Sequence, residues 1–166
     1  MENIIEFKSK TIVLAVNDID ISTDATPEET LSLFDIDNFK VIQTGFSHGT
    51  ITVISAGIPY QITTMRTDQN TDGRHADVRF SDNITEDAKR RDFTINGLYF
   101  DIKKSEVIDF VDGLNDLKEL QINMIGNPSE RFEEDPVRMI RAVRFKVKLS
   151  AKIDKKLNNI IIKNSL

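Results

Sequence analysis

The chain has 166 residues, of which 39% are hydrophobic and 30% charged, and a formal net charge of −5. This size suits one domain, or one domain and part of a second, with a buried core. The lack of cysteine excludes disulfides and cysteine-based zinc sites and fits a reducing compartment. Because the apolar runs are short and no secretory signal is recognised, we expect a cytoplasmic protein without membrane contact. The acidic balance argues against nucleic-acid binding by bulk electrostatics.

The N-terminal part predicts two strands and a helix. Ile12–Val16 is a short β-branched run typical of a strand. Asn17–Thr23 alternates acidic and apolar residues, which predicts a strand with one acidic and one apolar face. A helix is then expected to begin with Thr26 as N-cap, Pro27 at the first position and Glu29 closing a capping box.

Three β-rich segments follow, separated by turn residues. They are Phe39–Gly45, Gly49–Gly57 and Ile58–Arg66. The last two meet at Gly57 and predict an antiparallel hairpin. The polar, turn-rich segment 67–83 predicts a surface loop.

The C-terminal half changes from strands to helices. Thr85 is expected to cap a helix with acidic residues in its first turn. Two further strands are predicted around a turn at Lys103–Ser105, and a long helix is predicted to start near Asp135 with Pro136 at its first position. The fold class is therefore α+β, passing to all-α beyond a boundary near Asp112–Asn127.

Asp18 and Asp20 are the first chemical candidates. Alternate residues of a strand point to one face, so the two carboxylates would lie about 6–7 Å apart and can share a pair of Mg²⁺ ions. A lone D-x-D pattern also fits an edge strand with a solvated acidic face, and both interpretations stay open.

The segment RRDFTIN, residues 90–96, combines strong charge with apolar neighbours. Arg90 or Arg91 can form a forked contact with a phosphate or a carboxylate. Asp92 and Asn96 would share a face if the helix continues, and together they suit a ribose hydroxyl. The alternative is an internal Arg–Asp network at the end of a helix.

The segment EEDPVRMIRAVRF places Asp135, Arg138 and Arg141 at successive i+3 steps of the predicted helix. A carboxylate and guanidinium groups at this spacing can contact the edge of a base. Arg144 and Lys148 lengthen the basic stripe and are candidates for RNA binding. Alternatively, Asp135 is only an N-cap and the arginines form surface ion pairs.

Six segments occur here in the order found in one family: DIDISTDATPEE, HGTITV, YQITTMRTD, DGRHADVRF, EDAKRRDFTINGLYFD and RFEEDPVRMIRAVRF. From Asn17 to Leu149 the chain resembles bacterial tRNA nucleotidyltransferases (CCA-adding enzymes) and the related poly(A) polymerases. The resemblance implies a DNA polymerase β-like nucleotidyltransferase head with a mixed, largely antiparallel sheet, expected over residues 1–115. A truncated all-α neck that binds RNA or nucleobase would follow over residues 116–166.

The resemblance also implies a reaction and its participants. CMP or AMP would pass from CTP or ATP, with two Mg²⁺ ions, to the 3′ end of a tRNA or another RNA. Asp18 and Asp20 match the catalytic, metal-binding carboxylates. Some segments resemble the CCA-adding branch and others the poly(A) polymerase branch, so both products stay open.

The nucleotide-binding candidates follow from the same matches. Arg91 and Asp92 match the motif assigned to the ribose and the triphosphate. Asp135 and Arg138 match the pair that reads the incoming base, and Arg141 continues that motif. Asn96, from its spacing to Asp92, completes the set.

The sequence departs from the family pattern at three places. Ile12–Val16 runs almost directly into Asn17–Asp20, where the family carries a glycine pair and a Val-Arg-Asp helix. Gln61, on the strand expected to lie beside Asp20, stands where a glutamate is usual. The chain also ends soon after the base-reading helix. The alternative function is therefore an impaired or inactive remnant, a nucleotide-binding module, or one chain of a split enzyme whose second chain covers an exposed Ile160–Ile162.

Overall fold

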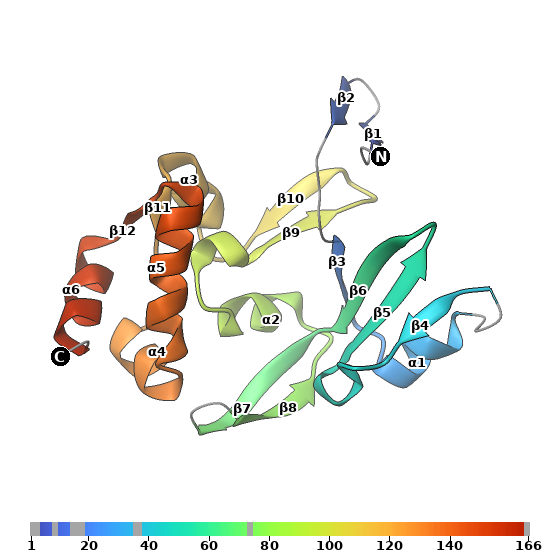
Figure 1. Ribbon diagram of the computed structural model, residues 1–166, viewed down its shortest axis with the longest axis horizontal. Helices are drawn as coiled ribbons and strands as arrows, with labels where there is room; N and C mark the ends of the chain where they lie inside the picture. Colours follow the sequence, from blue (N-terminus) through green and yellow to red (C-terminus); the bar gives the residue numbers. More distant parts are fainter. Residues whose placement is uncertain (1–3, 8–9, 14–18, 35–37, 73–74, 165–166) are drawn as a thin grey trace. The chain divides into compact units, whose positions relative to one another are not determined.

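The computed structural model describes residues 4–7, 10–13, 19–34, 38–72 and 75–164. The chain divides into two compact units, one formed by Met1–Arg66 with Phe80–Asn83 and the other by Thr67–Arg79 with Ile84–Leu166. Each unit has its own hydrophobic core. The elements of both units are labelled in Figure 1.

A four-stranded sheet organises the first unit. Its strands lie in the order β3-β6-β5-β4, with β3 parallel to β6 and the other two pairs antiparallel. Their bounds are β3 Ile19–Thr23, β4 Lys40–Ile42, β5 Thr50–Ser55 and β6 Ile58–Thr64. The prediction of an α+β fold with a mixed, largely antiparallel sheet is confirmed.

The alternation predicted for the D-x-D segment is present in β3. Ile19 and Ile21 are half-buried, whereas Asp20 and Ser22 are exposed. Residues 14–18 lie outside the described residues, so the predicted strand Ile12–Val16 is seen only through Val13. That part belongs to β2 (Lys10–Val13), which pairs antiparallel with β1 (Ile4–Phe7).

Helix α1 (Pro27–Ser32) begins as the sequence predicts. The backbone N–H of Glu29 donates to the Thr26 hydroxyl at 3.2 Å, and the Glu29 carboxylate accepts from the Thr26 N–H at 2.8 Å. Each partner thus satisfies a backbone donor that the helix leaves unpaired. The helix contacts β5 and β6, on which Ile51 and Ile62 are buried. The opposite face of the sheet carries the register partners Asp20, Gln61 and Thr52.

The hairpin between β5 and β6 is also confirmed. Ala56 and Gly57 form its tip with φ angles of 49° and 80°. Two residues with positive φ form the turn whose twist matches that of the flanking strands. Glycine adopts this conformation without the steric cost that other residues bear.

The loop predicted over residues 67–83 is wrong. Most of this segment forms β7 (Arg66–Asp72) and β8 (His75–Phe80), which pair into a two-stranded sheet. Its polar composition was typical of a loop. In paired strands, however, the backbone N–H and C=O groups of one strand form hydrogen bonds with the other strand. This pairing does not require an apolar face.

Helix α2 (Ile84–Arg90) leads into the second unit and begins before its predicted cap. Thr85 is a helical residue, so its assignment as N-cap is wrong. The helix begins two residues earlier than expected, and just before it the Asn83 N–H donates to the Ser81 hydroxyl at 3.1 Å.

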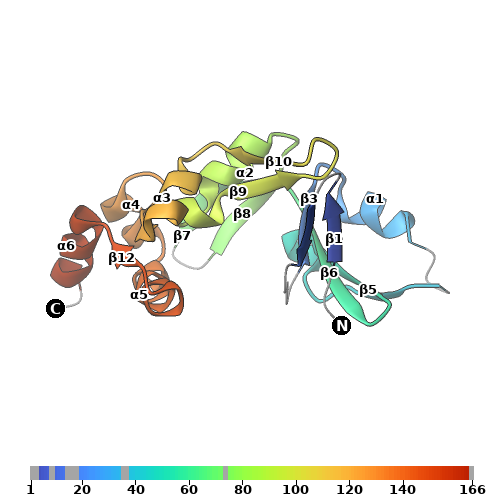
Figure 2. The ribbon, with the colours of Figure 1, turned by 90° about the horizontal axis from the view of Figure 1, so that it is seen from above.

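The remaining elements of the second unit are mainly helical. They are η2 Thr94–Asn96, β9 Leu98–Asp101, β10 Glu106–Asp109, α3 Gly113–Glu119, β11 Gln121–Ile122, α4 Pro128–Glu134, α5 Val137–Leu149, β12 Lys152–Ile153 and α6 Lys155–Asn164. Strands β9 and β10 form the predicted antiparallel hairpin. The short parallel pair β11–β12 was not predicted, and β12 lies between α5 and α6 (Figure 2). None of the described helices is long and apolar enough to cross a membrane.

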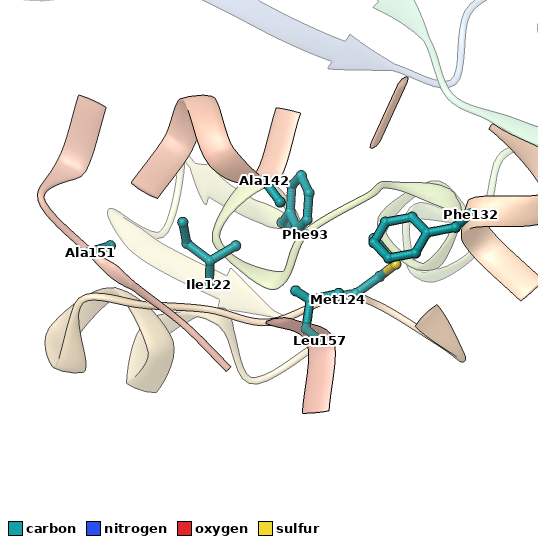
Figure 3. Packing of buried hydrophobic residues seen from close by; sticks show 7 residues of the cluster. All are labelled: Phe93, Ile122, Met124, Phe132, Ala142, Ala151 and Leu157. Carbon is teal, nitrogen blue, oxygen red and sulfur yellow. The ribbon is translucent and has the colours of Figure 1, made fainter. Parts of the chain in front are cut away.

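The core of the second unit gathers side chains from distant parts of the chain (Figure 3). It consists of Phe93, Ile122, Met124, Phe132, Ala142, Ala151 and Leu157. Phe93 is fully buried and meets the Phe145 ring edge to face, with centroids 5.7 Å apart. Ile160 and Ile161 pack partly against this core, so the predicted apolar segment is exposed mainly at Ile162. An amphipathic helix directs one face of such a run inward.

We predict that Phe93→Ala lowers the free energy of unfolding by about 3–5 kcal/mol, because it leaves a cavity in a packed core. Phe100→Ala is the matched control, since Phe100 is 45% exposed, and should cost about 1 kcal/mol or less. Urea unfolding followed by circular dichroism measures both. Equal losses in the two variants would contradict the assignment of Phe93 to the core.

Candidate functional site

The open face of the four-stranded sheet carries the first candidate residues. Asp20 and Gln61 are register partners on β3 and β6, and Thr52 of β5 is the next partner of Gln61. Register partners point to the same side of a sheet. Their register confirms that Asp20 and Gln61 are neighbours, as expected, and both side chains are exposed. A carboxylate, an amide and a hydroxyl thus lie in one row.

The predicted metal pair is described only in part. Asp18 lies outside the described residues, and Asp20 is exposed on the open face. Among the residues that the structure describes, no group of three or more His, Asp or Glu side chains is placed to hold a metal ion. The assignment of Asp18 and Asp20 to metal binding stays a prediction.

Asp87 is the most connected carboxylate of the second unit. It is almost fully buried in α2. One carboxylate oxygen accepts from Arg90 at 3.0 and 2.7 Å, and the other accepts from Arg91 at 3.1 Å and from the Tyr99 hydroxyl. Burial by itself would raise the pKa of Asp87, but the hydrogen bond from Tyr99 and the charges of Arg90 and Arg91 hold the pKa below its ordinary value.

The two adjacent arginines have different surroundings. Arg90 directs two N–H groups at one oxygen of Asp87, and 17% of its side chain is exposed. Arg91 reaches Asp87 with one terminal nitrogen and donates with the other to the Asn96 carbonyl at 2.9 Å. Its guanidinium lies 4.8 Å from the centre of the Tyr99 ring, and 30% of its side chain is exposed. The Arg–Asp network that the sequence left open is therefore present.

Asp92 and Asn96 are in contact, although the helix does not continue through them. Helix α2 ends at Arg90, and Asn96 closes the 3-10 turn η2. The Asn96 amide donates to Asp92 at 2.9 Å. The other oxygen of Asp92 forms an ion pair with Arg141 of α5 at 2.6 Å. Arg141 is thus tied to the segment RRDFTIN and does not form a surface pair with a neighbour on its own helix.

Glu134 links two further arginines. It pairs with Arg131 at 2.6 Å and with Arg138 at 2.8 Å. Arg131 also donates to the carbonyls of Arg90 and Arg91, the latter at 3.0 Å. These contacts fix α4 and the start of α5 against the end of α2.

Asp135 does not lie on the same helix face as Arg138 and Arg141. It has an extended backbone and ends α4, while α5 starts at Val137 with Pro136 as its N-cap. The predicted helical i+3 step from Asp135 is therefore wrong. A proline disfavours helical backbone in the residue before it. The Asp135 carboxylate instead accepts from the Val137 N–H at 3.0 Å. Arg144 and Lys148 are exposed on α5.

The residues just described form one arginine–carboxylate cluster. Its members are Arg90, Arg91, Arg131, Arg138 and Arg141, with Asp87, Asp92 and Glu134. Five guanidinium groups against three carboxylates leave two positive charges in a chain whose formal net charge is −5. Such a local excess attracts an anionic ligand.

Sequence reasoning missed several members of this cluster. Asp87 precedes Arg90 and Arg91 by three and four residues, which is the spacing of ion pairs along a helix. This spacing was visible in the sequence, but Asp87 was interpreted only as an acidic residue of the first turn that suits the helix dipole. Tyr99 carries no local signal, because Asp87 lies 12 residues away. Arg131 has local spacing to Glu134, but its contacts with the carbonyls of Arg90 and Arg91 are distant in the sequence.

Comparison with known proteins places this chain in a family. Residues 9–123 match the model of the poly(A) polymerase head domain. The chain belongs to the CCA-adding enzyme and poly(A) polymerase family. The CCA-adding enzyme of Lactobacillus delbrueckii subsp. bulgaricus is 46% identical over 90% of this chain, and that of Ligilactobacillus salivarius is 46% identical over 92%. In both cases the chain spans 37% of the relative.

Solved structures of this family have the same fold. The Bacillus stearothermophilus CCA-adding enzyme in complex with CTP is similar over 89% of this chain and 34% of that chain, with 35% identity and a TM-score of 0.78. A tRNA nucleotidyltransferase complexed with a primer tRNA and an incoming ATP analog is similar over 88% of this chain and 40% of that chain, with 27% identity and a TM-score of 0.68. The nucleotidyltransferase head expected from the sequence is thereby confirmed.

We predict that the contribution of Asp87 to stability depends on pH. Because its pKa is lowered in the folded protein, its contribution is complete above the ordinary carboxyl pKa of about 3.9 and disappears as the pH falls through the lower folded pKa. Asp87→Asn should cost on the order of 3 kcal/mol at pH 7, and this cost should shrink as the pH falls below about 3.9. Unfolding of both proteins across this pH range measures the difference. Glu86→Gln, at an exposed position of the same helix, should differ little from wild type; a constant cost of Asp87→Asn would contradict the assignment.

Proposed function

We propose that the chain is the head of a nucleotidyltransferase that adds CMP and AMP, from CTP and ATP, to the 3′ end of tRNA. The supporting observation is the 46% identity to CCA-adding enzymes over nine-tenths of the chain. Since the chain spans about a third of those relatives, its activity, substrates and partners are part of this proposal. In it, residues 1–115 form the head and residues 116–166 the start of a helical neck.

Asp18 and Asp20 are the proposed Mg²⁺ ligands. The described part of this site has suitable chemistry, because Mg²⁺ prefers oxygen ligands and the row of Asp20, Gln61 and Thr52 presents three kinds of oxygen on an open face. When bound, the ions supply positive charge to the attacking and leaving oxygens of phosphoryl transfer. The protein's own part is to hold Asp20 on β3, which pairs in parallel with β6 at the edge of the sheet.

Arg91, Asp92 and Asn96 are the proposed contacts to the triphosphate and the ribose. The excess positive charge of the arginine–carboxylate cluster supports an anionic ligand. The Asp92 carboxylate accepts from Asn96 and Arg141, and a carboxylate has enough lone pairs to accept a sugar hydroxyl as well.

Asp135, Arg138 and Arg141 are the proposed contacts to the base, and Arg144 and Lys148 the proposed contacts to RNA. Arg138 is held by Glu134 and by the Arg131 carbonyl at 2.8 Å. Both contacts are made by the same terminal nitrogen of Arg138, so the other donors of this planar group keep a defined direction, which favours discrimination between bases.

A nucleotide-binding module without catalysis is the second candidate. It is favoured by Gln61, an uncharged residue in register with Asp20, because loss of a carboxylate weakens a site for a divalent cation. A split enzyme is a related alternative, in which a second chain would supply the glycine pair and the carboxylate that the family pattern contains and this chain lacks.

Incorporation of labelled CTP and ATP into a tRNA that lacks its 3′ CCA, with Mg²⁺ present, tests the proposal. Ordered addition of C, C and A is expected from the wild-type chain, whereas a long A tail would indicate the poly(A) branch.

We predict that Asp20→Ala lowers incorporation by at least about a hundredfold, since removal of one electrostatic group at a reacting centre has this effect.

The matched control is Asp24→Ala, which removes an exposed aspartate just beyond β3 and should retain activity. Full activity of Asp20→Ala would refute its role. A folded wild-type chain that binds ATP but incorporates nothing would favour the binding module or the split enzyme.

We predict that Gln61→Glu tightens Mg²⁺ binding about fivefold, because a charge added near the ion at an exposed site contributes on the order of 1 kcal/mol. Gln43→Glu makes the same charge change at an exposed position beyond β4. Calorimetric titration with Mg²⁺ compares the two. The same affinity in both variants would show that the row of Asp20 and Gln61 is not the metal site.

A further inference from the structure

Buried Asp87 is unused by the function proposed above, yet it is bonded to the residue proposed to meet the phosphates. It lies in α2, and its side chain is 2% exposed. Its two oxygens together accept four hydrogen bonds, from Arg90 twice, from Arg91 and from Tyr99. A carboxylate with this many donors is held in one orientation, so it can in turn orient the groups that bind it.

The contacts of Asp87 make the two neighbouring arginines unequal. Arg90 turns one edge of its guanidinium onto a single oxygen of Asp87 and is the less exposed of the two. Arg91 is bound at both terminal nitrogens, to Asp87 and to the Asn96 carbonyl, while Tyr99 lies against its face. Arg91 therefore has a fixed plane and remains partly open to solvent.

Tyr99 completes this arrangement from another element. It lies on β9, donates its hydroxyl to Asp87, and places its ring against Arg91. The same side chain thus contacts both members of the Asp87–Arg91 pair. A guanidinium between a carboxylate, a carbonyl and an aromatic face loses little conformational entropy when it binds a further anion.

We infer that Asp87 is a positioning residue that, with Tyr99, selects Arg91 rather than Arg90 as the phosphate-facing arginine and fixes its guanidinium for a triphosphate. This inference rests on the proposed function, since it presupposes a nucleotide at this cluster. It adds that phosphate affinity depends on a buried carboxylate that does not itself touch the ligand.

Binding measured separately for the two halves of a nucleotide tests the inference. The probes are ATP, inorganic tripolyphosphate and adenosine, titrated into the whole chain. Asp87→Asn should weaken tripolyphosphate about tenfold or more, since a charge-assisted contact loses its alignment, and should change adenosine affinity by less than about twofold. A variant that is only destabilised would weaken both probes alike. The control is Glu86→Gln, at an exposed position of the same helix, which should bind all three probes as wild type does.

Tyr99→Phe provides a second test that does not depend on the folding of Asp87→Asn. It removes the hydroxyl that donates to Asp87 and keeps the ring beside Arg91. We expect tripolyphosphate binding to weaken about threefold, as the loss of one neutral donor would predict, with adenosine binding unchanged.

The outcomes separate the inference from the function on which it rests. If the wild-type chain binds neither ATP nor tripolyphosphate, both are overturned. If it binds both probes and Asp87→Asn and Tyr99→Phe retain wild-type affinity for tripolyphosphate, the inference alone is overturned.

Discussion

The end of helix α2 is the constraint on which the second unit depends. A helix leaves its last carbonyl groups without internal partners, and here Arg131, 40 or more residues later in the chain, donates to those of Arg90 and Arg91. The same short stretch holds Asp92, which binds Arg141. Two guanidinium groups from α4 and α5 therefore anchor the turn that carries the candidate nucleotide residues. Because Asp92 is buried, loss of Arg141 would leave the Asp92 charge uncompensated.

The two units present different chemistry. Among the described residues of the first unit, the open sheet face carries the Asp20 carboxylate, the Gln61 amide and threonine hydroxyls, and those of Thr50 and Thr63 lie 3.0 Å apart. The second offers guanidinium groups that are oriented by carboxylates. Oxygen ligands suit a hard cation and oriented guanidinium groups suit a phosphate.

Local signals in the sequence were sufficient where the interaction itself is local. The capping box at Thr26 and the tight turn at Gly57 are decided by residues a few positions apart, and both were predicted. The ionic partner of Arg141 and the register between Asp20 and Gln61 depend on the fold; resemblance to a family indicated the second but not the first. The hairpin of β7 and β8 was missed, since backbone pairing leaves little trace in a polar segment. Thr85 was wrongly assigned as an N-cap because α2 begins before it, and Asp135 does not continue the i+3 series of α5 because a proline follows it.

The contacts of the segment RRDFTIN with Arg131 and Arg141 affect the order in which the protein folds during synthesis. A ribosome releases the segment around Arg90 and Asp92 well before Arg131 and Arg141 emerge, and contacts between residues 40 to 49 positions apart are closed only after both have appeared. During synthesis Asp92 would therefore remain in water without Arg141, whereas Arg90 and Arg91 can already pair with Asp87. Any nucleotide pocket in this unit would be completed only when α5 docks, so a chain interrupted before Arg141 would have the motif but not the site.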